Sequence, residues 1–240
     1  MSAQGFSDWL DTPQGRYVVD WEQAKHDQLV VDIFGFNAVQ IGWRGLDYLR
    51  ANRMPFRFRC DDRDGDVDLR SDLHHLPLAT NSVDLVVLPH VLEFDANPHQ
   101  ILREVERVLV PEGSVIVTGF NPYSLWGARR GLARRNQLPP WRGRYISVAR
   151  LKDWFALLGL EPHAGAFGCY APAVTQDKWL QRFRWLDAAG DRWWPIGGAV
   201  YVIQAIKRVH GMTLLMPKWN ARLARAKALM PVTQKTDHGQ

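Results

Sequence analysis

The stretch from residue 83 to residue 119 constrains the fold more than any other part of the chain. Val83 to Leu88 form a mostly apolar run, which is typical of a strand buried on both faces of a parallel sheet. Asn97 and Pro98 then make a favourable helix start. An apolar stripe follows at helical spacing: Ile101, Leu102, Val105, Val108 and Leu109. After Pro111-Glu112-Gly113 stops this helix, residues 114–119 return to a strand pattern, so the stretch predicts strand–helix–strand.

The rest of the chain continues the alternation of helix and strand patterns. We expect helices over 20–34, where Gly35 ends the apolar face, over 46–51, and over 147–158 with Ser147 as its cap. Strand patterns occupy 38–41, 56–59, 160–167 and 199–206. Such alternation predicts an α/β sheet with helices on both faces.

Two segments interrupt the pattern, 121–146 and 171–198. Each follows the carboxyl end of a predicted strand, the edge where open α/β sheets bind ligands. They are therefore either capping insertions over a site or simple covers for exposed core. Within the second segment Trp179, Leu180, Phe183 and Leu186 share a helical face, and in the first we expect Asn121-Pro122-Tyr123 to form a turn. We predict one domain over 1–206 and a tail over 207–240.

The positive charge is concentrated in two places. The net charge is +5, yet residues 121–150 hold seven arginines and no acid, and 207–240 hold seven Lys or Arg and one acid. Residues 218–230 show the pattern of a short basic amphipathic helix. Residues 121–150 and 207–230 are thus candidate contacts for RNA or an anionic membrane surface; the alternative is that both are simply solvated.

Composition argues against several other classes. Cys60 and Cys169 are too few for a disulfide framework or a zinc site, and His74-His75 have no further ligand at a suitable spacing, so no metal is expected. No apolar run reaches the roughly 18 residues of a membrane span, and the first fifteen residues lack a secretory pattern. We expect a cytoplasmic protein.

About fifty residues resemble the middle of a known family. The matching phrases are Asp72-Leu73-His74-His75-Leu76-Pro77-Leu78, Asn81-Ser82-Val83-Asp84-Leu85-Val86, His90-Val91-Leu92-Glu93, and Leu102-Arg103-Glu104-Val105 through Arg107-Val108-Leu109-Val110-Pro111-Glu112-Gly113. In order and spacing they resemble class I S-adenosylmethionine-dependent methyltransferases of the type 11 kind. The phrases at 34–37 and 119–122 resemble a little-characterised bacterial branch. The resemblance implies a Rossmann-like, mostly parallel seven-stranded sheet whose last strand, 199–206, is antiparallel.

The resemblance also implies a site for S-adenosylmethionine. Gln40, Gly42, Arg44 and Gly45 occupy the glycine-rich turn, where a small residue lets the backbone approach the cofactor. Asp61 or Asp62 would bind the ribose hydroxyls, as acids do in dinucleotide folds. Asp72 would accept from the adenine amino group beside the backbone N–H of Leu73. Finally, Leu88, Pro89 and His90 would line the methionyl end.

The turn departs from the family pattern of an acid followed by three alternate glycines. The acid is replaced by Gln40, and Arg44 and Leu46 stand where two glycines are usual. Arg44 either pairs with the methionyl carboxylate or, together with Trp43, fills the pocket. There is also no room between Asp62 and Asp72 for the family's second helix.

Three hypotheses follow. The leading one is a methyltransferase acting on an unidentified acceptor; methyl transfer from a sulfonium runs largely on positioning, so a base is not compulsory. The second is a catalytically silent protein that keeps the fold for binding or scaffolding, and the third a nucleic-acid-binding protein without chemistry. His90 and Glu93 are the candidate catalytic residues, with an ordinary turn as the alternative for Glu93.

Overall fold

Seven strands form one sheet in the order β3-β2-β1-β4-β5-β7-β6. Their bounds are β1 Asn37–Ile41, β2 Phe56–Asp61, β3 Leu69–Arg70, β4 Val83–Pro89, β5 Leu109–Phe120, β6 Leu160–Gly168 and β7 Val200–Lys207. β1 to β5 pair in parallel, and β7 runs antiparallel to both β5 and β6. The predicted sheet, with its last strand antiparallel, is confirmed.

This computed structural model describes residues 9–43, 45–62, 67–132, 141–173, 178, 182–183 and 185–209. The chain divides into two compact units, Met1–Val209 and His210–Gln240, and all described residues belong to the first. The basic helix predicted over 218–230 lies outside them, as do Arg44, Trp179 and Leu180. No helix in the described part of the chain has the length and apolar character needed to cross a membrane.

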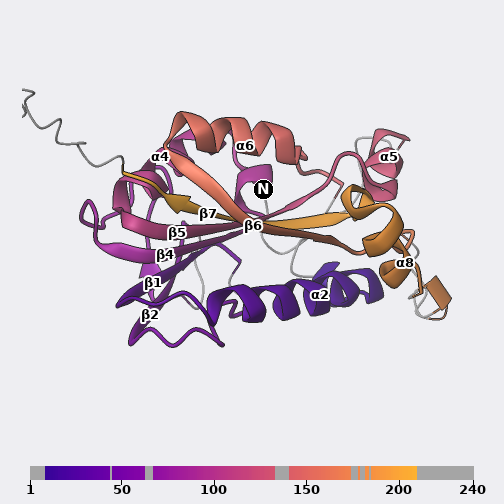
Figure 1. Cartoon of the computed structure of the whole chain (residues 1–240), viewed down its shortest axis with the longest axis horizontal. Coiled ribbons are helices and arrows are strands. Elements are labelled where there is room, and N and C mark those ends of the chain that lie inside the picture. The colour runs from indigo at the N-terminus through magenta and orange to yellow at the C-terminus, as the bar shows by residue number, and fades with distance from the viewer. Residues whose placement is uncertain are drawn as a thin grey trace, which may run out of the picture. The chain divides into compact units, whose positions relative to one another are not determined.

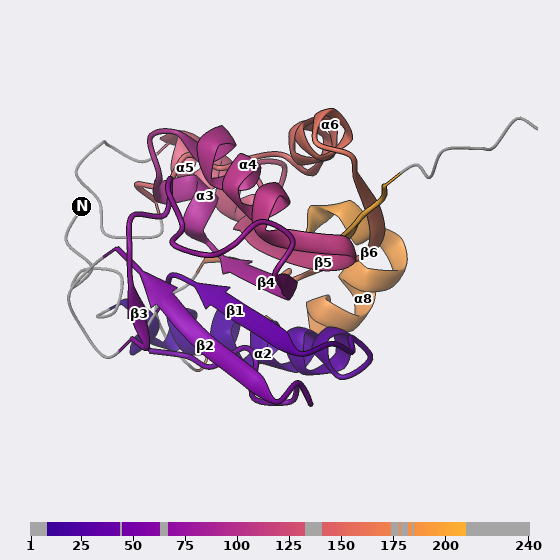
Figure 2. The same ribbon diagram turned by 90° about the vertical axis from the view of Figure 1, so that its left-hand side faces the viewer.

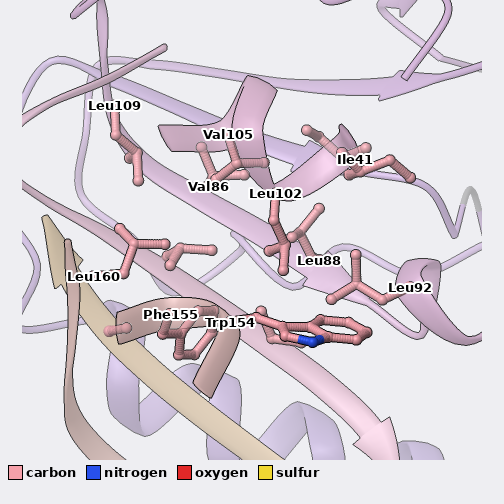
Figure 3. Packing of buried hydrophobic residues seen from close by; sticks show 14 of the residues in the cluster. Ile41, Val86, Leu88, Leu92, Leu102, Val105, Leu109, Trp154, Phe155 and Leu160 are labelled. Atoms are coloured by element: carbon pink, nitrogen blue, oxygen red, sulfur yellow. The ribbon is translucent and has the colours of Figure 1, made fainter. Parts of the chain in front are cut away.

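Helices cover the two faces of the sheet differently (Figure 1). α2 (Pro13–Val30) lies on one face, and α4 (Pro98–Val108) and α6 (Val148–Leu157) lie on the other. Leu102 and Val105 from α4 and Trp154 and Phe155 from α6 meet sheet residues such as Leu88 in the main apolar core (Figure 3). A second core on the α2 face contains Val30 and Tyr48 with strand residues of β1, β4, β5 and β7.

The first helix begins and ends earlier than the predicted 20–34. Pro13 occupies the first turn and the Thr12 side chain accepts from the Gly15 N–H, so the helix has a proper cap upstream of the apolar stripe. At its other end the Asn52 amide donates to the carbonyl oxygens of Val30 (2.7 Å) and Ile33 (3.1 Å). Helical structure therefore stops at Val30, well before Gly35.

Two further element predictions need correction. Residues 46–51 form turns and not a helix. The Gln40 side chain binds the Leu46 carbonyl and the Tyr48 N–H in this segment. Residues 111–113 are part of β5, which starts at Leu109 directly after α4, although the helix does end at Val108. Asn97 occupies the cap position of α4 but makes no side-chain cap bond there. The predicted start at Pro98 and the Ser147 cap of α6 are both confirmed.

The two interrupting segments cover a third apolar core. The first forms α5 (Leu125–Leu132), and the second forms α8 (Trp185–Trp193) and the 3-10 turn η1 (Pro195–Gly197). Beneath them Trp126 packs with Phe120, Cys169 and Trp9, and its indole N–H donates to the Ala171 carbonyl (2.8 Å). Asn121-Pro122-Tyr123 forms the predicted turn. Both segments therefore cover apolar core, and their role as capping insertions over a site stays a prediction.

Trp126→Ala tests how much this third core contributes. Because the side chain is fully buried, truncation is expected to lower the free energy of unfolding by about 3–5 kcal/mol. Denaturant titration followed by circular dichroism measures the change. Trp185→Ala, which alters a tryptophan that is mostly exposed, is the control and should change stability by no more than about 0.5 kcal/mol. Equal stabilities for the two variants would contradict a packed core under α5.

Candidate functional site

The candidate site lies where the strand order reverses. β2 and β3 continue from one side of β1, while β4 and β5 continue from the other, and in open α/β sheets ligands bind at the carboxyl ends of strands at such a point. Figure 2 shows β1 and β2 beside each other with β3 at the edge. The predicted residues Gly42, Asp61 and His90 follow or end the strands β1, β2 and β4 there.

Backbone hydrogen bonds bring the separate predicted motifs together. The Gly42 N–H donates to the Cys60 carbonyl (2.7 Å), and the Ser71 N–H donates to the Asp61 carbonyl (3.0 Å). The glycine turn thus adjoins the acid pair, and the acid pair adjoins the segment that begins at Asp72. Sequence analysis predicted this grouping only through the family resemblance.

Gln40 holds the turn after β1 from inside. Its side chain is fully buried, and its amide nitrogen lies 3.4, 3.1 and 2.8 Å from the carbonyl oxygens of Gly42, Trp43 and Leu46. Its amide oxygen accepts from the Tyr48 N–H (2.8 Å). The Leu46 carbonyl, which a helix over 46–51 would need for its first bond, is taken by Gln40, and the predicted helix is wrong. A carboxylate could not donate to these carbonyls, so the amide suits this turn better than the acid usual in the family.

The turn itself needs an unusual backbone. Gly42 has φ +76°, and a Cβ there would approach Val91 Cγ2 to 2.7 Å, so only glycine fits without displacement. Trp43 also has a positive φ, +54°, and its indole lies against the His90 ring with centroids 4.9 Å apart. Gly45, in contrast, is exposed with open space around it. Arg44 lies outside the described residues.

The acids differ in how accessible they are. Asp61 is 2% exposed, whereas its neighbour Asp62 is exposed at the end of β2. Asp72 is also exposed, and hydrogen bonds from the His75 ring, the His74 N–H and the His74 ring hold the pKa of its carboxyl well below the usual range. Within the described residues no cluster of side chains is suited to hold a metal ion.

The apolar members of the predicted site lie in the core. Leu73 and Leu88 are buried in the main apolar cluster, and Pro89 ends β4 as a buried residue. The Leu88 side chain is fully buried, and that of Leu73 is 7% exposed.

His90 is the centre of a buried ionic network. Its Nδ1 lies 2.7 Å from Glu93 Oε2, and its Nε2 lies 2.6 Å from Glu22 Oε1. The other Glu22 oxygen accepts from the Tyr48 hydroxyl (2.6 Å), and the other Glu93 oxygen accepts from the Phe120 N–H. His90, Glu22 and Glu93 are each at most 3% exposed. Each carboxylate oxygen therefore has a donor, as a buried charge requires.

The surroundings of His90 favour its charged form. With a carboxyl oxygen against each ring nitrogen, both nitrogens are placed to donate, as in an imidazolium, although burial also raises the pKa of Glu93. Burial by itself would lower the pKa of His90, but the two carboxylates outweigh it and raise the pKa to about 9. Nearby His26 is different: burial lowers its pKa, and its ring contacts the Glu22 carbonyl (2.8 Å) and the Thr118 hydroxyl (3.1 Å). His26 is neutral beside the charged His90.

Glu22 and Tyr48 were missed by sequence analysis. Glu22 lies on α2, 68 positions before His90, and the network is incomplete without it. A signal was present, because Glu22 and His26 stand four residues apart in the same buried row of the helix as Val18 and Val30. Polar residues at that spacing inside an apolar row indicate a buried polar pair.

Comparisons with known proteins support the fold and the resemblance. A family model described as a methyltransferase domain matches residues 51–117. The uncharacterized protein YafS of Escherichia coli strain K12 is 30% identical over 161 residues, 66% of this chain and 67% of that protein. The chain belongs to the class I S-adenosylmethionine-dependent methyltransferases of type 11.

Two more distant matches are methyltransferases by description. Demethylmenaquinone methyltransferase of Chlamydia pneumoniae is 29% identical over 83 residues, 33% of this chain and 35% of that enzyme. A solved SAM-dependent methyltransferase from Thermotoga maritima superposes with a TM-score of 0.58 at 16% identity, covering 80% of this chain and 97% of the other. At 16% identity this superposition supports the fold alone.

Gln40→Glu tests the internal clamp of the turn. The substitution introduces the acid usual in the family, but it places a carboxylate against three carbonyl oxygens, so the free energy of unfolding should fall by about 3 kcal/mol. Denaturant titration measures it, and Gln40→Met, which removes the four hydrogen bonds without adding charge, should also be destabilised. If the Glu variant were as stable as the wild type, the clamp would be refuted.

A pH titration tests the ionic network. The pKa of His90 is raised from 6.5 to about 9 in the folded chain, so its stabilising effect is complete below pH 6.5 and is lost as pH rises through about 9. The shift corresponds to about 3 kcal/mol. Imidazole NMR signals should show one histidine titrating near pH 9, and His26, assigned through His26→Gln, should show no charging near neutrality. A His90 midpoint near 6.5 would contradict the network.

Proposed function

We propose that this protein transfers a methyl group from S-adenosylmethionine to an acceptor at the carboxyl edge of β1, β2 and β4. The observation that supports this most directly is the chain of backbone contacts that brings Gly42, Asp61 and the segment from Asp72 together at the reversal of strand order. The bound cofactor supplies an electrophilic methyl group on a positively charged sulfur. Family membership makes this the expected chemistry.

The residues present fit this cofactor. Asp62 follows β2 and is exposed, whereas Asp61 is buried, so we assign the ribose hydroxyls to Asp62. Asp72 is ionised and exposed, as acceptance from the adenine amino group requires, and the Leu73 N–H is beside it. Gly42 provides close backbone approach, and Pro89 and His90 line the methionyl end.

His90 and Glu93 act in this proposal as a supporting wall and not as a base. An imidazolium that donates through both nitrogens cannot take a proton from an acceptor. Both oxygens of Glu93 are engaged as well. Catalysis then depends on orientation, which holds the nucleophile and the methyl group in line. The acceptor is accordingly one whose nucleophile is already deprotonated or loses its proton to water.

The catalytically silent alternative is motivated by Trp43. Its indole packs on His90, at the end where the methionyl group is proposed. Cys60 and Cys169 are buried free thiols. Because thiols stay reduced in the cytoplasm, they support our proposal that the reaction takes place there.

Calorimetric titration with S-adenosylmethionine tests the proposed function. The wild type should bind, and Asp62→Asn and Asp72→Asn should each weaken binding by about ten- to a hundredfold, because each loses a charge-assisted hydrogen bond. Asp153→Asn, on the exposed side of α6, is the control and should leave affinity unchanged. A wild type that binds no cofactor, beside an Arg44→Gly variant that does, would show that the pocket is closed and would overturn the proposal.

A further inference from the structure

Exposed aromatic and aliphatic side chains are concentrated in the two segments that follow β5 and β6. Among the described residues eleven large hydrophobic side chains are exposed, and six of them come from these segments. The six are Tyr123, Leu125, Trp185, Trp193, Trp194 and Ile196, here called the aromatic edge. Trp193 is 82% exposed, Tyr123 72% and Ile196 61%. Such a concentration of exposed apolar groups indicates an interaction surface.

The aromatic edge is held in place by buried polar contacts. The Asn121 amide donates to the carbonyl oxygens of Ile196 (2.7 Å) and Gly198 (2.9 Å), and its oxygen accepts from the Tyr123 N–H (3.0 Å). The turn that precedes α5 therefore lies next to η1. α8 is fixed separately, because Asp187 accepts from the Tyr17 hydroxyl and the Tyr170 N–H. Exposure of these apolar side chains is thus built into a fixed scaffold.

Arginines lie on the same helices as the aromatic edge. Arg129 and Arg130 stand in the last turn of α5, and Arg192 lies exposed in the last turn of α8, next to Trp193. α8 contains two acids: Asp187 points inward to its two donors, and Asp191 precedes Arg192 in the last turn. An apolar surface bordered by arginines complements a surface that is negative outside and apolar beneath.

We propose that the aromatic edge binds to the surface of an anionic membrane, with Trp193, Trp194 and Ile196 inserted among the lipid headgroups. Tryptophan and tyrosine favour the membrane interface because one part of each ring system is apolar and another can donate a hydrogen bond. The arginines contribute attraction to anionic lipid. The proposal does not depend on methyl transfer.

A membrane explains the composition better than RNA does. Leu125 and Ile196 have no ring face on which a base can stack, and their exposure is relieved only in an apolar medium. The arginines nearest to them are also partly engaged: Arg129 donates to the Ala173 carbonyl and lies over the Trp141 ring, and Arg130 lies over the Tyr145 ring. Their charge remains, but their side chains are not arranged as a free phosphate clamp.

Sedimentation with lipid vesicles tests the proposal on the full chain. Wild type should bind vesicles of phosphatidylcholine with phosphatidylglycerol more tightly than vesicles of phosphatidylcholine alone, and raising salt from about 0.1 M to about 0.5 M should weaken binding without abolishing it. The variant Trp193→Ser/Trp194→Ser should bind at least about tenfold more weakly, because two apolar side chains no longer insert. Brominated lipids should quench tryptophan fluorescence in wild type and much less in this variant.

Phe34→Ser/Phe36→Ser is the matched control. These two aromatic side chains are also exposed, but they precede the amino end of β1, whereas the aromatic edge follows the carboxyl ends of β5 and β6. It should bind vesicles like wild type. Thermal unfolding should be unchanged in both double variants, since only exposed side chains are altered. Full retention of vesicle binding by the Trp193/Trp194 variant would place membrane contact elsewhere, for example in 207–240, and overturn the proposal. So would a wild type that binds single-stranded RNA or self-associates through these tryptophans but ignores anionic vesicles.

Discussion

The buried imidazolium of His90 between Glu22 and Glu93 is the interaction on which the rest of the site depends. Titratable groups removed from water are tolerated only when every charge is paired and every oxygen has a donor. Here the donors come from Tyr48 in the turn after β1 and from the Phe120 N–H at the end of β5. One network thus joins α2, β4, α3 (Val91–Phe94) and β5 at the carboxyl edge.

The turn after β1 is held by side-chain bonds that differ from the family pattern. Where the family uses an acid and several glycines, this chain uses one amide, Gln40, to hold three carbonyl oxygens and one N–H. The turn keeps Gly42 at its critical position and brings Trp43 onto the charged ring of His90. The altered motif is therefore a folded, internally bonded structure and not a loss of structure.

The parts of the fold that sequence analysis predicted correctly are those specified by local pattern. The strand at 83–88 and the helix from Pro98 follow from apolar spacing and a favourable helix start, both of which act within a few residues. Residues 46–51 have a helical pattern too, but Gln40 binds their backbone groups from another element, so local propensity is overridden. Ladder partners and side-chain clamps of this kind depend on the folded arrangement, which a single sequence does not display.

In the candidate site, too, some residues belong to a recognisable motif and others acquire a role only in the folded arrangement. The glycine turn and the acids after β2 were predicted because they belong to contiguous motifs of a family. Glu22 was not, because an acid on an apolar helix face acquires meaning only when its partner is known, and His90 is far away in sequence. The two segments that cover the third core were recognised as exceptions to the alternation, but their buried Trp126 and exposed Trp193 look alike in sequence.

The distance between Glu22 and His90 along the chain also bears on how the protein is made. α2 leaves the ribosome early, yet its buried acid has no cation until β4 has emerged, and Glu93 gains its backbone donor only when Phe120 follows. Long-range contacts of this kind form late, since the loop between the partners must close first. Glu22 thus reaches Tyr48, 26 positions on, well before its charged partner His90, so the complete network requires nearly the whole sheet.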